Sequence, residues 1–254
     1  MSILKLENIT QEFGGLRALD NVSLEVKKQQ IFGIIGPNGA GKTTLFNIIT
    51  GIYIPTAGHL IFKDQNITGT PAFNIARMGI ARTFQNIRLF GKLSVIDNVR
   101  VGAHGITNSG LISNLFKLPK ARKEEKIITE KAIQLLELVG LEDNKWEYAD
   151  NLSYGDQRRL EIARALALKP TLLLLDEPAA GMNSVEKAEL MTLIEKIRQE
   201  KDLTILLVEH DMNLVMNICE RIAVLDYGKK IAEGNPKEIK NDDRVIRSYL
   251  GVEA

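Results

Sequence analysis

A glycine-rich stretch that ends in a lysine and a threonine is the strongest chemical signal in the sequence. Residues 36–43 read Gly-Pro-Asn-Gly-Ala-Gly-Lys-Thr and fit the pattern G-x-x-x-x-G-K-[ST]. Glycines allow such a loop to turn its backbone N–H groups inward around phosphate oxygens, and a helix that begins near the lysine adds its positive dipole end. The pattern predicts a nucleoside triphosphate site, in which Lys42 reaches the β- and γ-phosphates and the Thr43 hydroxyl binds Mg²⁺.

Two carboxylates, Asp176 and Glu177, directly follow the apolar run 172–175. Ligands of open α/β sheets bind beyond the carboxyl ends of the strands. We therefore expect Asp176 to hold Mg²⁺ through its hydration shell. Glu177, on the other side of the strand, is expected to polarise the attacking water. A solvated turn can also carry such a pair, but the phosphate loop in the same chain favours the catalytic interpretation.

The elements that must position these residues follow from the apolar periodicity. The stretch 31–35 before the loop predicts a buried central strand, and a helix is expected over 45–50. Alternating residues at 4–9 and 22–26 predict half-exposed antiparallel strands, and 60–62 predicts a further edge strand. The remaining strands, which alternate with helices and so predict a mostly parallel sheet, are expected at 172–175, 204–208 and 222–225.

The pattern becomes helical between residues 90 and 172. Helical periodicity appears at 130–138 and 157–168, whereas 102–117 is rich in Gly, Asn and Ser and predicts a loop. The predicted fold class is therefore α/β: a P-loop NTPase core with a mostly parallel sheet, an antiparallel β-subdomain and an inserted helical subdomain. We expect one cassette over 1–254, with the nucleotide-binding core at 1–90 and 165–254 and the helical subdomain at 91–164.

Composition narrows the choice of function. A formal net charge of +1 argues against a generic nucleic-acid binder, and a single cysteine excludes an intrachain disulfide. We find no secretory signal and no apolar run near the roughly 20 residues of a membrane helix. The basic segment 117–126 fits either a patch for phosphates or lipid headgroups or, because Glu124 and Glu125 offset its cations, a solvated helix start.

Further stretches fall in a fixed order, and with them the sequence resembles the ATPase subunits of ABC transporters over nearly its whole length. The family signature Leu-Ser-Gly-Gly-Gln corresponds to Leu-Ser-Tyr-Gly-Asp at 152–156. The family's glutamine corresponds to Gln85, its loop after the acidic pair to 180–183, and its switch histidine to His210. The aromatic residue that stacks on adenine corresponds to Phe13. Order and spacing carry the resemblance, because each residue alone is more often an ordinary surface or core residue.

The resemblance implies a role for each residue. Glu177 and His210 would position the water and, with Lys42, form the catalytic set. Gln85 would sense Mg²⁺ and the γ-phosphate, and would be a metal ligand together with Thr43 and Asp176. The nucleotide-binding residues would be Phe13, Gly36, Pro37, Asn38, Gly39, Ala40, Gly41, Lys42, Thr43, Thr44 and Gln85.

The resemblance also implies a head-to-tail dimer. Ser153, Tyr154 and Gly155 of one subunit would contact the γ-phosphate that the other subunit holds. Two residues depart from the family pattern: Tyr154 replaces the first signature glycine and Asp156 replaces the glutamine. A tyrosine keeps its backbone N–H, whereas a carboxylate beside a triphosphate is repulsive unless it is screened or turned away. The glutamine's nucleotide contact is therefore not assigned to Asp156.

Within the family, the resemblance is strongest to the ATPases of branched-chain amino acid importers. It rests on residues 151–155, 176–183 and 243–251. The implied cofactors are ATP and Mg²⁺, and the implied partners are integral membrane permease subunits and a second ATPase subunit, without nucleic acid. The implied location is cytoplasmic, on the inner face of the cell membrane. ATPases of lipopolysaccharide export, non-transport ABC ATPases of DNA repair or translation, and a regulatory pseudo-ATPase are the alternatives.

Replacement of Phe13 by alanine tests the adenine site. If adenine stacks on the Phe13 ring, Phe13→Ala weakens ATP binding by about 1–3 kcal/mol, by analogy with base–aromatic stacking. Stacking uses only the face of the ring, so GTP is expected to substitute partly for ATP. Titration with both nucleotides measures this, and unchanged affinities for both would place the base elsewhere.

Overall fold

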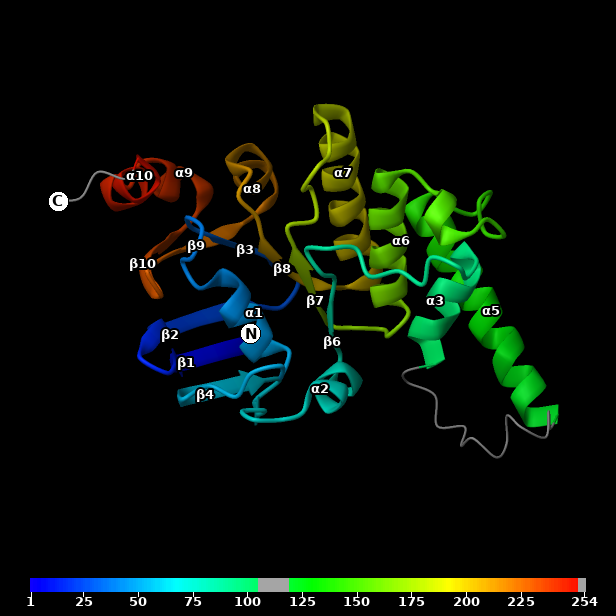
Figure 1. Cartoon of the computed structure of the whole chain (residues 1–254), viewed down its shortest axis with the longest axis horizontal. Helices are drawn as coiled ribbons and strands as arrows, with labels where there is room; N and C mark the ends of the chain where they lie inside the picture. Colours follow the sequence, from blue (N-terminus) through cyan, green and yellow to red (C-terminus); the bar gives the residue numbers. More distant parts are fainter. Residues whose placement is uncertain (105–118, 251–254) are drawn as a thin grey trace. The chain divides into compact units, whose positions relative to one another are not determined.

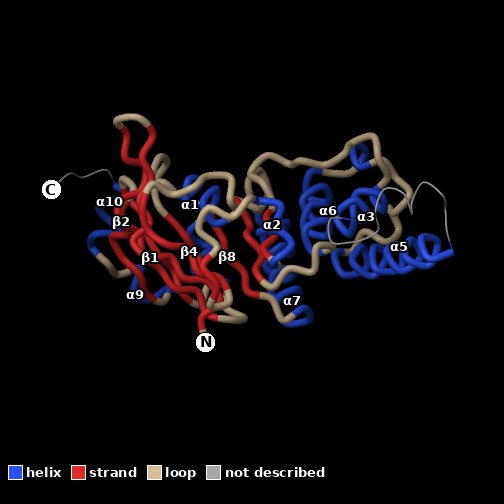
Figure 2. Tube along the Cα trace, turned by 90° about the horizontal axis from the view of Figure 1, so that it is seen from below, coloured by secondary structure: helices blue, strands red, loops and turns tan. Residues whose placement is uncertain are grey.

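A computed structural model describes residues 1–104 and 119–250. The chain forms two compact units, one built from Met1–Arg82 and Thr171–Ala254, the other from Thr83–Pro170. The strands of the larger unit form two sheets, whereas the described part of Thr83–Pro170 is made of helices and loops (Figures 1 and 2). The α/β class predicted from the sequence is confirmed.

The larger sheet of the first unit has six strands in the order β10-β9-β3-β8-β7-β6. All neighbouring pairs are parallel except β9 with β10. Every residue of β3, β7 and β8 is buried, which explains why these strands are almost continuous apolar runs. The strands span Ile31–Ile35 (β3), Ile80–Arg82 (β6), Leu172–Asp176 (β7), Thr204–Val208 (β8), Arg221–Asp226 (β9) and Lys229–Gly234 (β10).

The second sheet is antiparallel, with the order β2-β1-β4-β5. Its strands span Ser2–Phe13 (β1), Leu16–Lys27 (β2), Ala57–Phe62 (β4) and Gln65–Asn66 (β5). The stretch 60–62 was expected at an edge, and this was wrong, because the two-residue β5 pairs with Ile61 and Phe62 on the far side of β4. Apolar residues of β1, β2 and β4 form one core with residues of β3 and of the helix that follows it.

The helices of the first unit are α1 (Lys42–Ile49), α2 (Ala72–Met78), α7 (Ser184–Lys201), α8 (Met212–Ile218), α9 (Pro236–Lys240) and α10 (Asp243–Leu250). Polar side chains fix where several of them begin. Asn183 accepts from the N–H groups of Val185 and Glu186 in a capping box, and Asp211 caps α8 in a similar way. Both caps lie in loops that follow β7 and β8.

The second unit contains α3 (Val95–His104), α5 (Pro119–Val139), the 3-10 helix η1 (Ala149–Asn151) and α6 (Tyr154–Leu166). The loop expected over 102–117 is wrong at its start, because 102–104 complete α3. A Cβ on Gly102 would lie 2.4 Å from the Arg164 carbonyl oxygen, so the glycine allows α3 to pack closely on α6. The rest of that expected loop, 105–117, lies outside the described residues.

One other expectation, the basic segment 117–126, concerns the helical unit. Helix α5 begins within the basic segment, at Pro119, which agrees with the interpretation of this segment as a helix start. Residues 117 and 118 and the side chains of 119–123 lie outside the described part of the structure. Trp146 of the helical unit is 71% exposed. None of the helices in 1–104 and 119–250 combines the length and apolar character that crossing a bilayer requires.

Gly33 offers a test of the central strand. A Cβ at this position would lie 2.9 Å from Cys219 Sγ, at the end of α8, and 3.3 Å from Val215 Cγ1. Gly33→Ala is therefore expected to destabilise the fold by about 1–3 kcal/mol through overpacking. Adding Cys219→Ala removes the nearer atom and should restore part of that loss. Chemical denaturation measures both effects.

The matched control is Gly15→Ala, because no atom lies within 4 Å of a Cβ at Gly15. This variant should unfold near the wild-type midpoint. Additive effects of Gly33→Ala and Cys219→Ala would contradict the proposed contact.

Candidate nucleotide site and catalytic cluster

The phosphate loop connects β3 to α1, as the sequence predicts. Gly36, Gly39 and Gly41 have φ values of 150°, 82° and 100°, in the region that favours glycine. A Cβ on Gly36 would also lie 2.1 Å from the Leu225 carbonyl oxygen of β9. The loop therefore depends on glycine both for its backbone angles and for its close approach to the neighbouring strand.

Lys42 is the first residue of α1 and is buried, with 6% of its surface exposed. Its Nζ donates to the Gly36 carbonyl at 2.6 Å and to the Pro37 carbonyl at 2.9 Å. Burial lowers the pKa of Lys42, and the charges of Glu177 and Asp176 partly oppose that shift. The lysine therefore interacts with both members of the acidic pair as well as with its own loop. Thr43 follows it at the start of the same helix.

Asp176 ends β7 and is buried beside Arg82, a residue the sequence analysis did not single out. Arg82 Nη2 lies 2.6 Å from Asp176 Oδ2, and Arg82 Nη1 lies 2.7 Å from Asn47 Oδ1. The guanidinium also lies 5.4 Å from the centre of the Phe46 ring. Arg82 of β6, held in place by Asn47 and Phe46 of α1, therefore orients the Asp176 carboxylate. The sequence feature that could have indicated this contact is an arginine, Arg82, at the end of β6, which pairs with β7.

The residues present fit a magnesium ion held largely by a nucleotide. The described residues contain no group of three or more His, Cys, Asp or Glu side chains that could hold a metal ion by themselves. Mg²⁺ usually keeps several waters and binds one or two carboxylates plus substrate phosphates. Asp176 and the Thr43 hydroxyl supply hard oxygen ligands of this kind.

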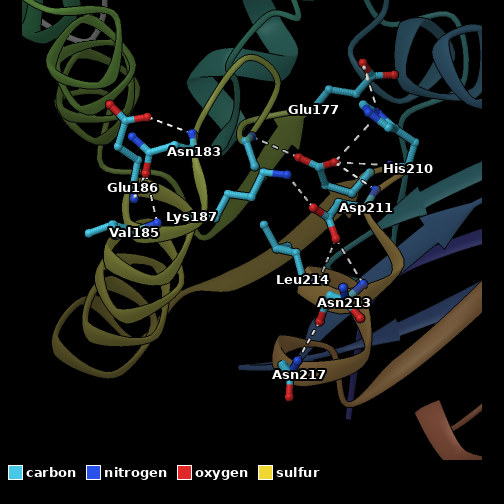
Figure 3. Close-up of polar contacts among 12 residues, drawn as sticks. Glu177, Asn183, Val185, Glu186, Lys187, His210, Asp211, Asn213, Leu214 and Asn217 are labelled. Atoms are coloured by element: carbon cyan, nitrogen blue, oxygen red, sulfur yellow. Dashed lines mark hydrogen bonds and ion pairs between the residues drawn. The ribbon is translucent and has the colours of Figure 1, made fainter.

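Glu177 and His210 come together from the loops that follow β7 and β8 (Figure 3). Glu177 Oε2 lies 3.6 Å from His210 Nδ1, with side chains that are 17% and 59% exposed. Because β7 ends at Asp176 and Glu177 adopts a φ of 47°, its side-chain direction is set by this turn rather than by strand alternation. The Glu177 N–H donates to the Val208 carbonyl at 2.8 Å, which ties the turn to the end of β8. The pair offers a base and an imidazole to a water at the edge of the sheet.

Phe13 lies at the end of β1 and is 43% exposed, so its ring is accessible to a base. The Tyr53 ring meets it edge-on, with ring centres 5.2 Å apart and planes at 71°. This arrangement supports the Phe13 ring from one side. The sequence analysis missed Tyr53, because nothing in its spacing marks it as a neighbour of Phe13.

Gln85 and the signature residues belong to the other unit, Thr83–Pro170. Ser153 caps α6, since its Oγ accepts from the Asp156 N–H at 3.2 Å. Its hydroxyl also lies 2.8 Å from Asp156 Oδ2 as a donor. The carboxylate that replaces the family glutamine is thus bonded within the first turn of its own helix.

The tyrosine that replaces the signature glycine contacts Arg158, which the sequence analysis also missed. Arg158 is 2% exposed and donates to the Tyr154 hydroxyl at 3.0 Å, to the Phe84 carbonyl at 2.7 Å and to the Gln85 carbonyl. It also pairs with Glu161 at 3.2 Å, whose carboxylate accepts from the Phe84 N–H. Arg158 therefore links the signature to the backbone that carries Gln85.

Comparison with known proteins defines the class of this molecule. A family model described as ABC transporter matches residues 19–180, and one described as branched-chain amino acid ATP-binding cassette transporter matches residues 229–254. The chain belongs to the ABC transporter family, as one of its ATP-hydrolysing cassettes.

Individual relatives place the chain more closely. It is 48% identical to the high-affinity branched-chain amino acid transport ATP-binding protein LivG of Escherichia coli K12, over 98% of both chains. It is 35% identical to the lipopolysaccharide export system ATP-binding protein LptB of the same organism, over 99% of this chain and 98% of that one.

Solved structures agree with the family. The ADP conformation of an ATP-binding cassette of an ABC transporter superposes with a TM-score of 0.87 at 33% identity, covering 99% of this chain and 100% of that chain. A dimeric cassette in a post-hydrolysis state, bound to ADP and Pi, gives a TM-score of 0.77 at 27% identity, covering 92% and 99%.

Removal of the Tyr154 hydroxyl tests the link through Arg158. In Tyr154→Phe, Arg158 loses one acceptor, and the Gln85 backbone that it also holds should open more often. We expect faster amide hydrogen exchange over 83–88, with a stability loss of about 0.5–1.5 kcal/mol. Tyr148→Phe, at another exposed tyrosine of the same unit, is the control. Equal exchange over 83–88 in wild type and Tyr154→Phe would contradict the link.

Proposed function

We propose that this chain is the ATP-hydrolysing subunit of an importer of branched-chain amino acids. The observation that carries the proposal is its 48% identity to LivG over 98% of both chains. The separate match of residues 229–254 to the branched-chain model supports the same substrate class from a part of the chain outside the phosphate site. The lower identity to LptB, 35%, makes lipopolysaccharide export the weaker candidate.

The proposed nucleotide site is centred on the phosphate loop. In the unit of Met1–Arg82 and Thr171–Ala254, adenine stacks on Phe13 and the phosphates bind the loop from Gly36 to Thr44. Lys42 neutralises charge on the β- and γ-phosphates. The buried position of Lys42 at the start of α1 supports this role. We infer that this unit is the nucleotide-binding core and that Thr83–Pro170 is the helical subdomain.

Hydrolysis in this proposal depends on Glu177 and His210. Glu177 accepts a proton from the attacking water, and His210 holds the water and the γ-phosphate in line. The 3.6 Å separation of their side chains supports a shared task. When bound, Mg²⁺ would neutralise phosphate charge, held by Thr43, Gln85 and Asp176.

Two subunits are proposed to close head to tail around two nucleotides. Ser153, Tyr154 and Gly155 at the start of α6 of one subunit then meet the γ-phosphate bound to the other. The start of a helix supports this role, because free N–H groups and the helix dipole favour an anion there. Closure and reopening would drive integral membrane permease subunits, with this chain on the cytoplasmic face of the membrane.

Uptake of labelled leucine tests the transport proposal. Deletion of the gene should abolish high-affinity leucine uptake, and the wild-type gene should restore it. A gene carrying Glu177→Gln should fail to restore uptake, because loss of a general base lowers turnover by about 10²–10⁴-fold. The amide is nearly isosteric, so the purified variant should still bind ATP.

The background strain must lack a second importer. Normal leucine uptake in the deletion strain would overturn the substrate assignment and leave the ATPase assignment intact. Normal ATP turnover by purified Glu177→Gln would instead overturn the catalytic role of Glu177.

A further inference from the structure

Glu209 is a buried carboxylate that has no role in the reaction described above. It follows the last residue of β8, directly precedes His210 and is only 1% exposed. Its Oε1 accepts from the Ala179 N–H at 2.9 Å. Its Oε2 accepts from the N–H groups of His210 at 3.1 Å and Asp211 at 3.4 Å.

These bonds join the two segments that carry the catalytic pair. Ala179 lies two residues after Glu177, in the loop from β7 to α7, whereas His210 and Asp211 lie in the loop from β8 to α8. One carboxylate therefore holds both loop backbones. Lys187 of α7 adds a second connection, with its Nζ 2.5 Å from Asp211 Oδ2 (Figure 3).

The Glu209 carboxylate also faces the imidazole itself. Its Oε2 lies 3.8 Å from His210 Nδ1, and Glu177 Oε2 lies 3.6 Å from the same atom. His210 is thus held through its backbone N–H by Glu209 and approached at its ring by two carboxylates. The His210 side chain is 59% exposed, so the protein restrains it chiefly from this buried side.

We propose that Glu209 is a positioning residue for ATP hydrolysis, which sets His210 against Glu177 by binding the backbones of both loops. The inference rests on the proposed roles of Glu177 and His210. It adds a residue that does not touch the substrate and acts through His210.

The energetics favour a positioning role over simple packing. Burial raises the pKa of Glu209, although the N–H groups that it accepts from oppose that shift. For an acid with a raised pKa, stability is highest at low pH and is lost as pH rises through the folded-state pKa, so the ionised form is a net cost near neutrality. An apolar residue would avoid the cost of a buried charge, but it would leave the N–H groups of Ala179, His210 and Asp211 without this acceptor. A carboxylate offsets the cost of burying its charge because one oxygen accepts from the loop after β7 and the other accepts from the loop after β8.

The decisive variant is Glu209→Gln in the full chain. The amide keeps the size and one acceptor oxygen, but its NH₂ group cannot accept from the second loop. Removal of a buried charge and loss of an acceptor act in opposite directions on stability, so the melting temperature should stay within about 5 °C of wild type. We expect kcat to fall at least about tenfold, whereas KM for ATP should change less than about twofold, because an interaction needed only in the transition state is lost.

Glu233→Gln is the matched control. Glu233 is also a largely buried carboxylate, 16% exposed and paired with Arg221 and Lys230 on β9 and β10. Its replacement should leave kcat and KM at wild-type values. If Glu209→Gln does not fold, Glu209→Asp provides the test, since it keeps the charge but is one methylene too short to reach both loops. It should show the same loss of kcat.

A double-mutant cycle with His210→Ala decides whether Glu209 acts through His210. Single-turnover hydrolysis, which resolves slow rates, should show that Glu209→Gln causes less than about a twofold further loss in the His210→Ala background. A further tenfold loss there, or wild-type kcat in folded Glu209→Gln or Glu209→Asp, would overturn the positioning role. Wild-type kcat in His210→Ala alone would instead remove the catalytic role of His210 on which the proposal rests.

Discussion

The parallel register of β3, β8 and β7 is the constraint on which the candidate nucleotide site of this molecule depends. Val208 is paired with Ile34 of β3 on one side and with Asp176 of β7 on the other. The residues that follow these three positions therefore leave the sheet at the same edge. Because these three strands are parallel, the phosphate loop, the acidic pair and the loop that carries His210 all begin at this edge of the sheet. An antiparallel sheet would have sent one of the three to the opposite edge.

Charges at this edge are buried and paired rather than solvated. Lys42 is held by two loop carbonyls, Asp176 by Arg82, and Glu209 by backbone N–H groups from two loops. A buried charge without partners would be very unfavourable, and partners of this kind fix direction as well as energy. Side chains held in this way have fixed directions, which is the condition for electrostatic stabilisation of a transition state without reorganisation.

A buried charge with several partners also lies beside the signature residues of the helical unit. Arg158 is fully enclosed, yet its guanidinium is shared among the Tyr154 hydroxyl and the carbonyls of Phe84 and Gln85. Five donors in a planar fork allow one arginine to hold acceptors from its own helix and from the loop that carries Phe84 and Gln85. The substitution of tyrosine for the signature glycine thus comes with a partner one helical turn away, on the same face of α6.

Strands β6 and β10 were not predicted, but the sequence by itself determined the buried strands β3, β7 and β8 and the motif of the phosphate loop. It did so because buried parallel strands are continuous apolar runs and because a phosphate loop requires glycines, a lysine and a hydroxyl at fixed spacing. Periodicity alone placed β3, β8 and the start of β7 correctly. The loop expected over 102–117 was wrong at 102–104, because Gly102 was interpreted as a loop residue, whereas it allows α3 to pack closely on α6.

Only the tertiary structure revealed the partners of these residues. These partners come from segments that are distant in the sequence or separated by a turn whose geometry the sequence does not predict. The contacts are Arg82 with Asp176, Tyr53 with Phe13, Arg158 with Gln85, and Glu209 with two loops. Apolar periodicity predicts which face of a helix or strand is buried. It does not predict which polar group of the neighbouring helix or strand lies opposite that face. The physical reason is that a hydrogen bond depends on positions within a few tenths of an ångström, which are set by packing of the whole core rather than by local residue order.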